Sequence, residues 1–144
     1  MNRVARIVTV LLLVAVGSSA SFSRAAAGTF RAGAAAVDVT PRNAAPEPPS
    51  IIAGGFLEGR AERVHDPLFV RAIVLDDGGS GGREPVRIAL VVVDSCMMPQ
   101  PLLDEAKALA AKRCGIPAER MMVSATHTHA APAAMGCLGT RQDA

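Results

Sequence analysis

The sequence contains no tryptophan and no tyrosine, and its four phenylalanines make aromatic residues only 3% of the chain. Proteins that read single-stranded nucleic acid stack the bases on aromatic side chains, so this mode of binding is not expected. An excess of one charge is also missing, because setting aside Arg3 and Arg6 leaves 13 basic residues against 13 acidic ones. Without a basic face to collect phosphates, nucleic acid is excluded as a partner.

Several catalytic signatures are absent as well. The chain has no phosphate-binding loop, no nucleophile elbow, no dinucleotide-binding fingerprint and no CxxC pair. A disordered chain is excluded too, because hydrophobic residues make up 50% of the sequence and charged residues only 19%. The 144 residues therefore predict about one folded domain.

The first twenty residues have the layout of a secretory signal peptide. Two arginines lie in residues 1–6, residues 7–16 are apolar or small, and residues 18–20 are the small residues that a signal peptidase accepts. The apolar run is about half of the roughly 20 residues that span a bilayer, so a membrane anchor is the weaker alternative. Residues 1–20 therefore predict a secreted or periplasmic protein, with cleavage within residues 25–27 as a second option.

Three cysteines, Cys96, Cys114 and Cys137, leave at least one thiol unpaired within the chain. A single disulfide can form, but the spacing does not choose its partners. Cys114 falls at the expected end of a helix, where we expect a buried structural cysteine.

The strand pattern after the signal predicts a mixed α/β fold. A flexible lead over residues 21–31 precedes a short strand within residues 34–40. Residues 68–75 and 86–94 are rich in β-branched residues and flank a glycine-rich turn, which predicts a hairpin. The second of these strands is apolar almost throughout, as is typical of a central strand that is covered on both faces.

A helix and a further strand complete the predicted order. Pro101 suits the first turn of a helix, and Gly115 suits its end. The expected apolar stripe of this helix consists of Leu102, Leu103, Ala106, Leu109 and Ala110. Residues 121–125 predict a strand that returns to the same sheet. The expected fold is therefore a mixed β-sheet flanked by helices, as the N-terminal portion of a larger catalytic domain.

Two glycines, Gly54 and Gly55, interrupt an apolar stretch before the hairpin. Paired glycines fill a tight turn or let another group approach the backbone closely. The turn is the preferred interpretation.

Two of the three histidines lie in a Thr-His-Thr-His run at the end of the last predicted strand. In an extended chain His127 and His129 would point to the same face, about 7 Å apart along the backbone. Neutral imidazole is a favoured zinc ligand and also transfers protons near neutral pH. The alternative is a pair of hydrogen-bonded surface histidines beside a turn.

Residues 122–132 (MVSATHTHAAP) resemble the signature of the neutral/alkaline non-lysosomal ceramidase family, in which a strand ends in a similar Thr-His-Thr-His run. Residues 35–41, 54–56, 64–72 and 91–94 agree with other parts of that family in order and spacing. The resemblance extends from about residue 32 to residue 137. It implies that residues 32–144 are part of a ceramidase-like catalytic domain.

The resemblance implies a zinc-dependent amide hydrolase, which cleaves ceramide into a fatty acid and a sphingoid base. In that family two histidines, a glutamate and a tyrosine hold the zinc, which activates a water and stabilises the oxyanion. His127 matches the first histidine ligand, and His129 matches the residue that assists proton transfer or polarises the carbonyl. His65 matches a family histidine near the site without a firm role, and a buried structural histidine is an equal alternative.

The sequence also departs from the family pattern. It has no tyrosine, Ala130 replaces the usual serine, and the second histidine and the glutamate ligand come from a later part of the family's chain. The expectation is an N-terminal fragment that is inactive without the missing C-terminal part of the enzyme. Asp94, Cys96 and Cys137 are candidates for substitute ligands.

The expected substrate is ceramide or another N-acyl lipid, with peripheral membrane contact as a further option. One alternative is a small exported metal-binding module without catalysis. Another is a related zinc hydrolase that acts on a different N-acyl or ester substrate. Because one helix covers only part of one sheet face, we expect exposed apolar surface and self-association of the chain alone.

Overall fold

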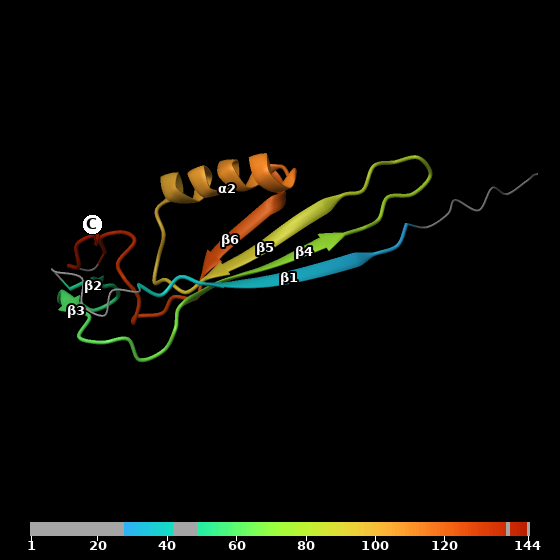
Figure 1. Cartoon of the computed structure of the whole chain (residues 1–144). Coiled ribbons are helices and arrows are strands. Elements are labelled where there is room, and N and C mark those ends of the chain that lie inside the picture. Colours follow the sequence, from blue (N-terminus) through green and yellow to red (C-terminus); the bar gives the residue numbers. More distant parts are fainter. Residues whose placement is uncertain (1–27, 42–48, 138, 144) are drawn as a thin grey trace, which may run out of the picture.

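The computed structural model describes residues 28–41, 49–137 and 139–143. The predicted signal peptide, residues 1–20, and most of the predicted lead lie outside these residues. The described chain has a mixed α/β fold, with a four-stranded mixed sheet, a two-stranded sheet and one α-helix (Figure 1). No helix in this part of the chain has the length and hydrophobicity needed to cross a bilayer.

The larger sheet has the strand order β1-β4-β5-β6. Its strands are β1 (Arg31–Asp38), β4 (Phe69–Asp76), β5 (Arg87–Val93) and β6 (Met121–Ala125). The β1/β4 and β4/β5 pairs are antiparallel, whereas β5 and β6 are parallel. The predicted hairpin and the predicted return strand are confirmed.

The β4–β5 turn is held by side chains as well as by its glycines. Asp77 Oδ1 accepts hydrogen bonds from the backbone N–H groups of Gly79 (3.0 Å) and Val86 (2.8 Å). Asp77 Oδ2 lies 2.6 Å from Arg83 Nη2. Carboxylates that bond to nearby backbone N–H groups favour such turns.

Helix α2 (Gln100–Cys114) and the 3₁₀ turn η1 (Ala118–Arg120) connect β5 to β6. Pro101 lies in the first turn of the helix, as predicted. Gly115 ends the helix in the left-handed region at φ 69°, and its N–H donates to Ala111 O at 3.0 Å. A glycine reaches this conformation without steric cost, which explains why the helix ends here.

The predicted apolar stripe of α2 is only partly correct. Leu102 and Leu109 are 45% and 50% exposed. The contact with the sheet is made by Ala110, which belongs to the predicted stripe, and by Ala111, which does not. Both pack against the core cluster of Ala89, Ile116 and Met121. Only the C-terminal turns of the helix lie in this cluster, and spacing along a helix does not say which turns meet the sheet.

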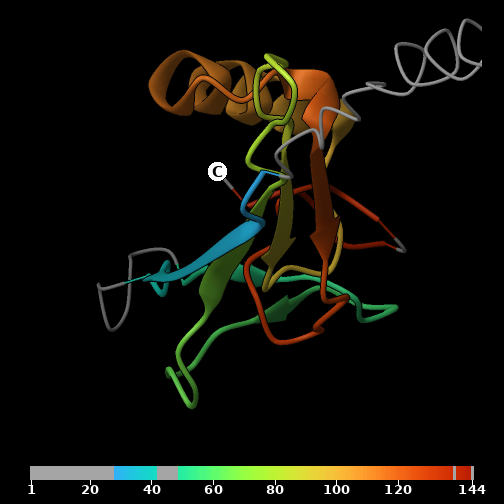
Figure 2. The same ribbon diagram turned by 90° about the vertical axis from the view of Figure 1, so that its right-hand side faces the viewer.

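Within the described part of the chain only one face of the sheet is covered, although β5 is central as predicted. Gly33, Val74, Ala89 and Met121 are register partners on the face toward α2. The adjacent row, Ala34, Ile73, Leu90 and Met122, points to the opposite face, because successive side chains along a strand alternate. Ile73 is 47% exposed and Met122 is 58% exposed. Figure 2 shows α2 lying across the upper ends of the strands in that view.

The smaller sheet pairs β2 (Ile51–Ile52) with β3 (Gly59–Arg60) in antiparallel register. The last described segment folds against it, since the N–H of Ala133 donates to Ile51 O and the N–H of Ile51 donates to Asp143 Oδ1. Ile51, Ala53, Cys96 and Ala133 form the second core cluster. This cluster joins the end of β5 to the segment that follows the two histidines.

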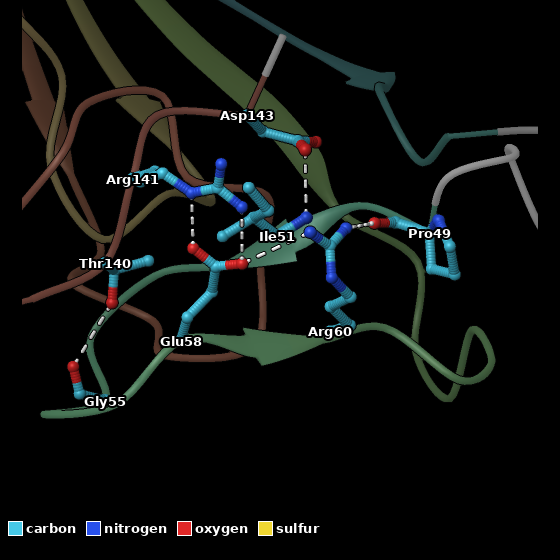
Figure 3. A network of polar contacts seen from close by, with 8 residues as sticks. All are labelled: Pro49, Ile51, Gly55, Glu58, Arg60, Thr140, Arg141 and Asp143. Atoms are coloured by element: carbon cyan, nitrogen blue, oxygen red, sulfur yellow. Dashed lines mark hydrogen bonds and ion pairs between the residues drawn. The ribbon is translucent and has the colours of Figure 1, made fainter.

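Polar contacts tie the same segment to the loop between β2 and β3 (Figure 3). Arg141 makes two hydrogen bonds to Glu58, at 2.8 and 2.9 Å, and these bonds are the main cause of the lowered pKa of Glu58. Thr140 Oγ1 donates to Gly55 O at 3.2 Å. Gly55 and Glu58 of this loop are therefore fixed to the last described segment of the chain.

Candidate metal centre

The two histidines lie in the loop directly after β6. The N–H of Thr126 still donates to Val93 O at 2.9 Å, but β5 ends at Val93 and offers no further partner. His127 then adopts the left-handed region at φ 62°. The extended conformation predicted for this run is therefore wrong at His127, because no neighbouring strand continues there.

The turn nevertheless brings the two rings together. The ring centroids of His127 and His129 are 5.0 Å apart, with an interplanar angle of 72°. Both residues are exposed. The predicted proximity of the imidazoles holds in the structure, although a left-handed turn produces it and not a strand.

A backbone carbonyl fixes the orientation of the His127 ring. His127 Nδ1 lies 3.0 Å from Cys96 O. A carbonyl oxygen can only accept, so Nδ1 carries the hydrogen in this contact, and in the neutral imidazole Nε2 then has the lone pair. This arrangement is typical of a metal-ligating histidine, whose other nitrogen donates to a carbonyl or carboxylate.

Cys96 adds a sulfur to the same place. Its side chain is buried, at 2% exposure, and its Sγ lies 3.8 Å from His127 Nδ1. One ligand atom from each of Cys96, His127 and His129 can be chosen so that all three lie within 4.8 Å of one another. Nitrogen and sulfur ligands of this kind suit zinc, so the residues fit that ion. Burial is the main cause of the raised pKa of the Cys96 thiol, with a smaller contribution from Cys137.

Gly54 provides the space in which His129 lies. A Cβ atom at this position would lie 2.5 Å from His129 Cγ, and the backbone of Gly54 has φ 95°. The glycine pair therefore serves both suggested purposes: it bends the chain, and it admits another side chain against the backbone. The preference for a turn alone was incomplete, because sequence spacing does not reveal a contact with a residue so far along the chain.

Asp94 has partners other than the Cys/His group. Its Oδ2 accepts hydrogen bonds from the backbone N–H of Phe69 and from Arg71 Nη1, each at 2.8 Å. The bond from Phe69, followed by that from Arg71, lowers the pKa of Asp94, and Thr126 contributes a further hydrogen bond. The carboxylate thus joins the start of β4 to the start of the histidine loop, and it is not part of the Cys/His group among the described residues.

His65 is not a buried structural histidine. Its side chain is 81% exposed, and its Nδ1 donates to Asp66 Oδ2 at 2.8 Å. It lines a cavity of about 500 Å³ together with Thr128, the residue between the two candidate ligands. His65 is therefore near the histidine loop but outside the Cys/His group.

The other two cysteines differ from each other in burial. Cys137 is half-buried, and it contributes to the raised pKa of the Cys96 thiol. Cys114 is exposed, so the expectation of a buried structural cysteine is wrong. The residue follows the turns of α2 that face the sheet, but its own position at the helix end faces solvent.

The cavity beside the loop is lined by both apolar and polar residues. Its apolar lining includes Ile52, Val64, Leu68 and Pro132. Arg63, His65 and Asp94 supply charged or titratable groups. A ligand with an apolar chain and a polar group fits such a lining.

Sequence reasoning missed the roles of the Cys96 carbonyl and of Gly54. Backbone acceptors have no sequence signal, and the contact of Gly54 with His129 had only the glycine pair as a hint. Comparisons of the chain with protein-family models, with curated proteins and with solved structures found no match.

Proposed function

We propose that this chain carries the metal-ligating part of an exported, zinc-dependent amide hydrolase of the neutral ceramidase type. The proposed substrate is ceramide or a related N-acyl lipid. The observation that carries the proposal is the hydrogen bond from His127 Nδ1 to Cys96 O, which leaves Nε2 available beside the exposed ring of His129.

His127 is the proposed metal ligand. A bond from Nδ1–H to a carbonyl makes the opposite nitrogen a better ligand and holds the ring in one orientation. The 3.0 Å contact with Cys96 supplies that bond. When bound, zinc would lower the pKa of a water and polarise the substrate carbonyl.

His129 is the proposed proton-transfer residue. Its ring centroid lies 5.0 Å from that of His127, and the residue is exposed. An imidazole near neutral pH can accept a proton from the attacking water and deliver it to the leaving amine nitrogen. The absence of a side chain at Gly54 leaves room for this ring against the backbone.

The cavity beside the loop supports a lipid substrate. Its apolar residues Ile52, Val64 and Leu68 can contact an acyl chain, while Thr128 connects the cavity to the histidine loop. Peripheral contact with a membrane surface would deliver such a substrate. The remaining zinc ligands would come from a C-terminal part of the enzyme, so the chain alone is proposed to be inactive.

A second candidate is a small exported metal-binding module. The group Cys96, His127 and His129 favours it, because three donors from this chain suffice for a closed site with one further ligand. In that case the Cys96 thiolate would be a ligand, whereas in the hydrolase its backbone carbonyl only orients His127.

Activity assays on the exported protein from its native source test the proposed hydrolase function. We expect it to release fatty acid from an N-acyl-sphingosine, to lose this activity with a chelator and to regain it with zinc. His129→Ala should lower hydrolysis by about 100-fold or more with unchanged zinc content, because proton transfer typically contributes this much. His65→Ala is the matched control and should leave the zinc content unchanged. An exported, zinc-loaded protein that leaves N-acyl lipids uncut would contradict the proposal and favour the module.

A further inference from the structure

The loop between β2 and β3 carries the two most exposed large hydrophobic side chains of the described residues. Phe56 is 83% exposed and Leu57 is 84% exposed, and the two are adjacent in the sequence. We propose that this pair, the apolar tip, inserts into the interface of a lipid bilayer and docks the protein there. The choice of a lipid as the partner rests on the proposed function, whose substrate is an N-acyl lipid.

Hydrogen bonds on both sides of the apolar tip hold the loop in place. Before the tip, Gly55 O accepts a hydrogen bond from Thr140 Oγ1 at 3.2 Å. After the tip, Glu58 accepts two hydrogen bonds from Arg141, at 2.8 and 2.9 Å (Figure 3). The backbone is therefore anchored while the two apolar side chains are in solvent. A loop that is already ordered loses little conformational entropy when it binds.

The small size of the apolar tip favours a bilayer over a protein partner. A phenylalanine buries about 150–250 Å², so this residue and one leucine fall well short of the roughly 1,000 Å² of a specific protein interface. A bilayer interface accepts a small apolar group without matching its shape, and amphipathic helices bury their apolar side chains about 5–10 Å deep in it.

The charged side chains beside the apolar tip balance one another. Glu58 pairs with Arg60 at 3.2 Å as well as with Arg141, and Asp143 accepts a hydrogen bond from the N–H of Ile51. Two arginines and two carboxylates therefore lie around the β2–β3 pair (Figure 3). Anionic lipids attract an excess of basic residues, and this group of four has none. The expected partner is a neutral phosphatidylcholine surface.

The same loop also contacts the candidate metal centre. Gly54, two residues before Phe56, lies against His129, where an added Cβ would be 2.5 Å from the ring. Ile52 of β2 and Thr128 of the histidine loop both line the cavity of about 500 Å³. Insertion of the apolar tip would therefore bring the cavity and the histidine loop to the lipid surface from which the proposed substrate comes.

Flotation of the exported protein that carries this chain with phosphatidylcholine vesicles tests the docking without an enzyme assay. Phe56→Ser combined with Leu57→Ser should lower the partition coefficient at least about tenfold, because burial of even one such side chain accounts for about tenfold or more. Phe56→Trp should bind as well as the wild type or better, since tryptophan favours the membrane interface. Leu109→Ser, at a position of α2 that is 50% exposed, is the control and should bind like the wild type.

Salt provides a second test of the same docking. Raising the ionic strength from about 0.1 M to about 0.5 M screens charges, so binding that depends on apolar side chains should change by less than about twofold. Absence of flotation in the wild type, loss of binding at high salt, or equal binding by the wild type and the double variant would overturn the proposal.

Hydrolysis of two substrates separates this inference from the proposed function. The double variant should cut a short-chain, water-soluble N-acyl-sphingosine at the wild-type rate, but a long-chain one in vesicles at least about tenfold more slowly. An equal fall on both substrates would overturn a role in docking. A wild type that floats with vesicles, in contrast to the double variant, but cuts neither substrate would contradict the proposed function and still support the docking.

Discussion

At the scale of single residues, the candidate metal centre depends on one unusual backbone conformation. Within residues 28–41, 49–137 and 139–143, His127 is the only non-glycine residue with positive φ. The left-handed region costs such a residue about 1–2 kcal/mol, and strain of this kind is concentrated at functional sites. Here the strained turn places Nδ1 at the Cys96 carbonyl and brings the ring to within 5.0 Å of His129.

A methyl group at Gly54 should disturb His129 directly. In Gly54→Ala the new Cβ would overlap the imidazole and the backbone would be strained, so we expect a loss of about 2–4 kcal/mol in the free energy of unfolding. Gly81→Ala is the control, since Gly81 also has positive φ but no neighbour within 4 Å; it should lose only about 1 kcal/mol. Denaturant titration measures both values, and NMR signals of His129 should move in the first variant alone. Equal losses and an unmoved His129 would show that the contact is absent.

At the scale of secondary structure, the β4–β5 hairpin should be sensitive to acid. Asp77 has its pKa lowered from 3.8 to about 2, mainly by the hydrogen bond from Arg83 and then by backbone N–H groups. The folded state therefore binds protons more weakly than the unfolded state, and the stabilisation is complete above the unfolded pKa. It should be lost as the pH falls from about 4 towards 2.

In Asp77→Asn the free energy of unfolding should depend less on pH in this range, because the carboxyl group that titrates is absent. Denaturation midpoints measured through the same pH range give the comparison. Glu105→Gln, on the exposed surface of α2, removes one negative charge as a control and should keep the wild-type slope. An unchanged slope in Asp77→Asn would show that the turn carboxylate does not account for the acid sensitivity.

Elements with local signals were predicted well from the sequence. Gly115 ends α2 because a left-handed residue is needed there, and β-branched runs on both sides of a glycine-rich turn formed the hairpin. Features that depend on distant partners were not predicted. The two-residue strands β2 and β3, the sheet-facing side of α2 and the turn at His127 all depend on contacts that no short pattern contains.

At the scale of the whole molecule, one face of the four-stranded sheet is bare among residues 28–41, 49–137 and 139–143. The row Ala34, Ile73, Leu90 and Met122 crosses all four strands on the side away from α2. Among the described residues, no large side chain is fully buried, so the core is thin for a sheet of this size. Exposed apolar surface of this kind favours association with another surface.

The purified chain should therefore associate as its concentration rises. Replacing Ile73 and Met122 together by lysine should weaken this association by at least about tenfold, which corresponds to 1.4 kcal/mol. Leu109→Lys, at an equally exposed position of α2, should leave it unchanged. Sedimentation velocity over a concentration series distinguishes these results. A wild type that stays monomeric throughout, or a control that dissociates equally, would argue against the bare face as the site of association.

Zinc binding by the exported protein that carries this chain, purified from its native source, tests the central claim most directly. Titration against a chromogenic chelator gives the stoichiometry and the affinity of the wild type, His127→Ala and His65→Ala. We predict one zinc per chain, a loss of at least about 100-fold in affinity for His127→Ala, and no change for His65→Ala, because only His127 is oriented by the Cys96 carbonyl. Equal affinities in all three proteins, or no zinc in the wild type, would contradict the assignment of His127 as a metal ligand.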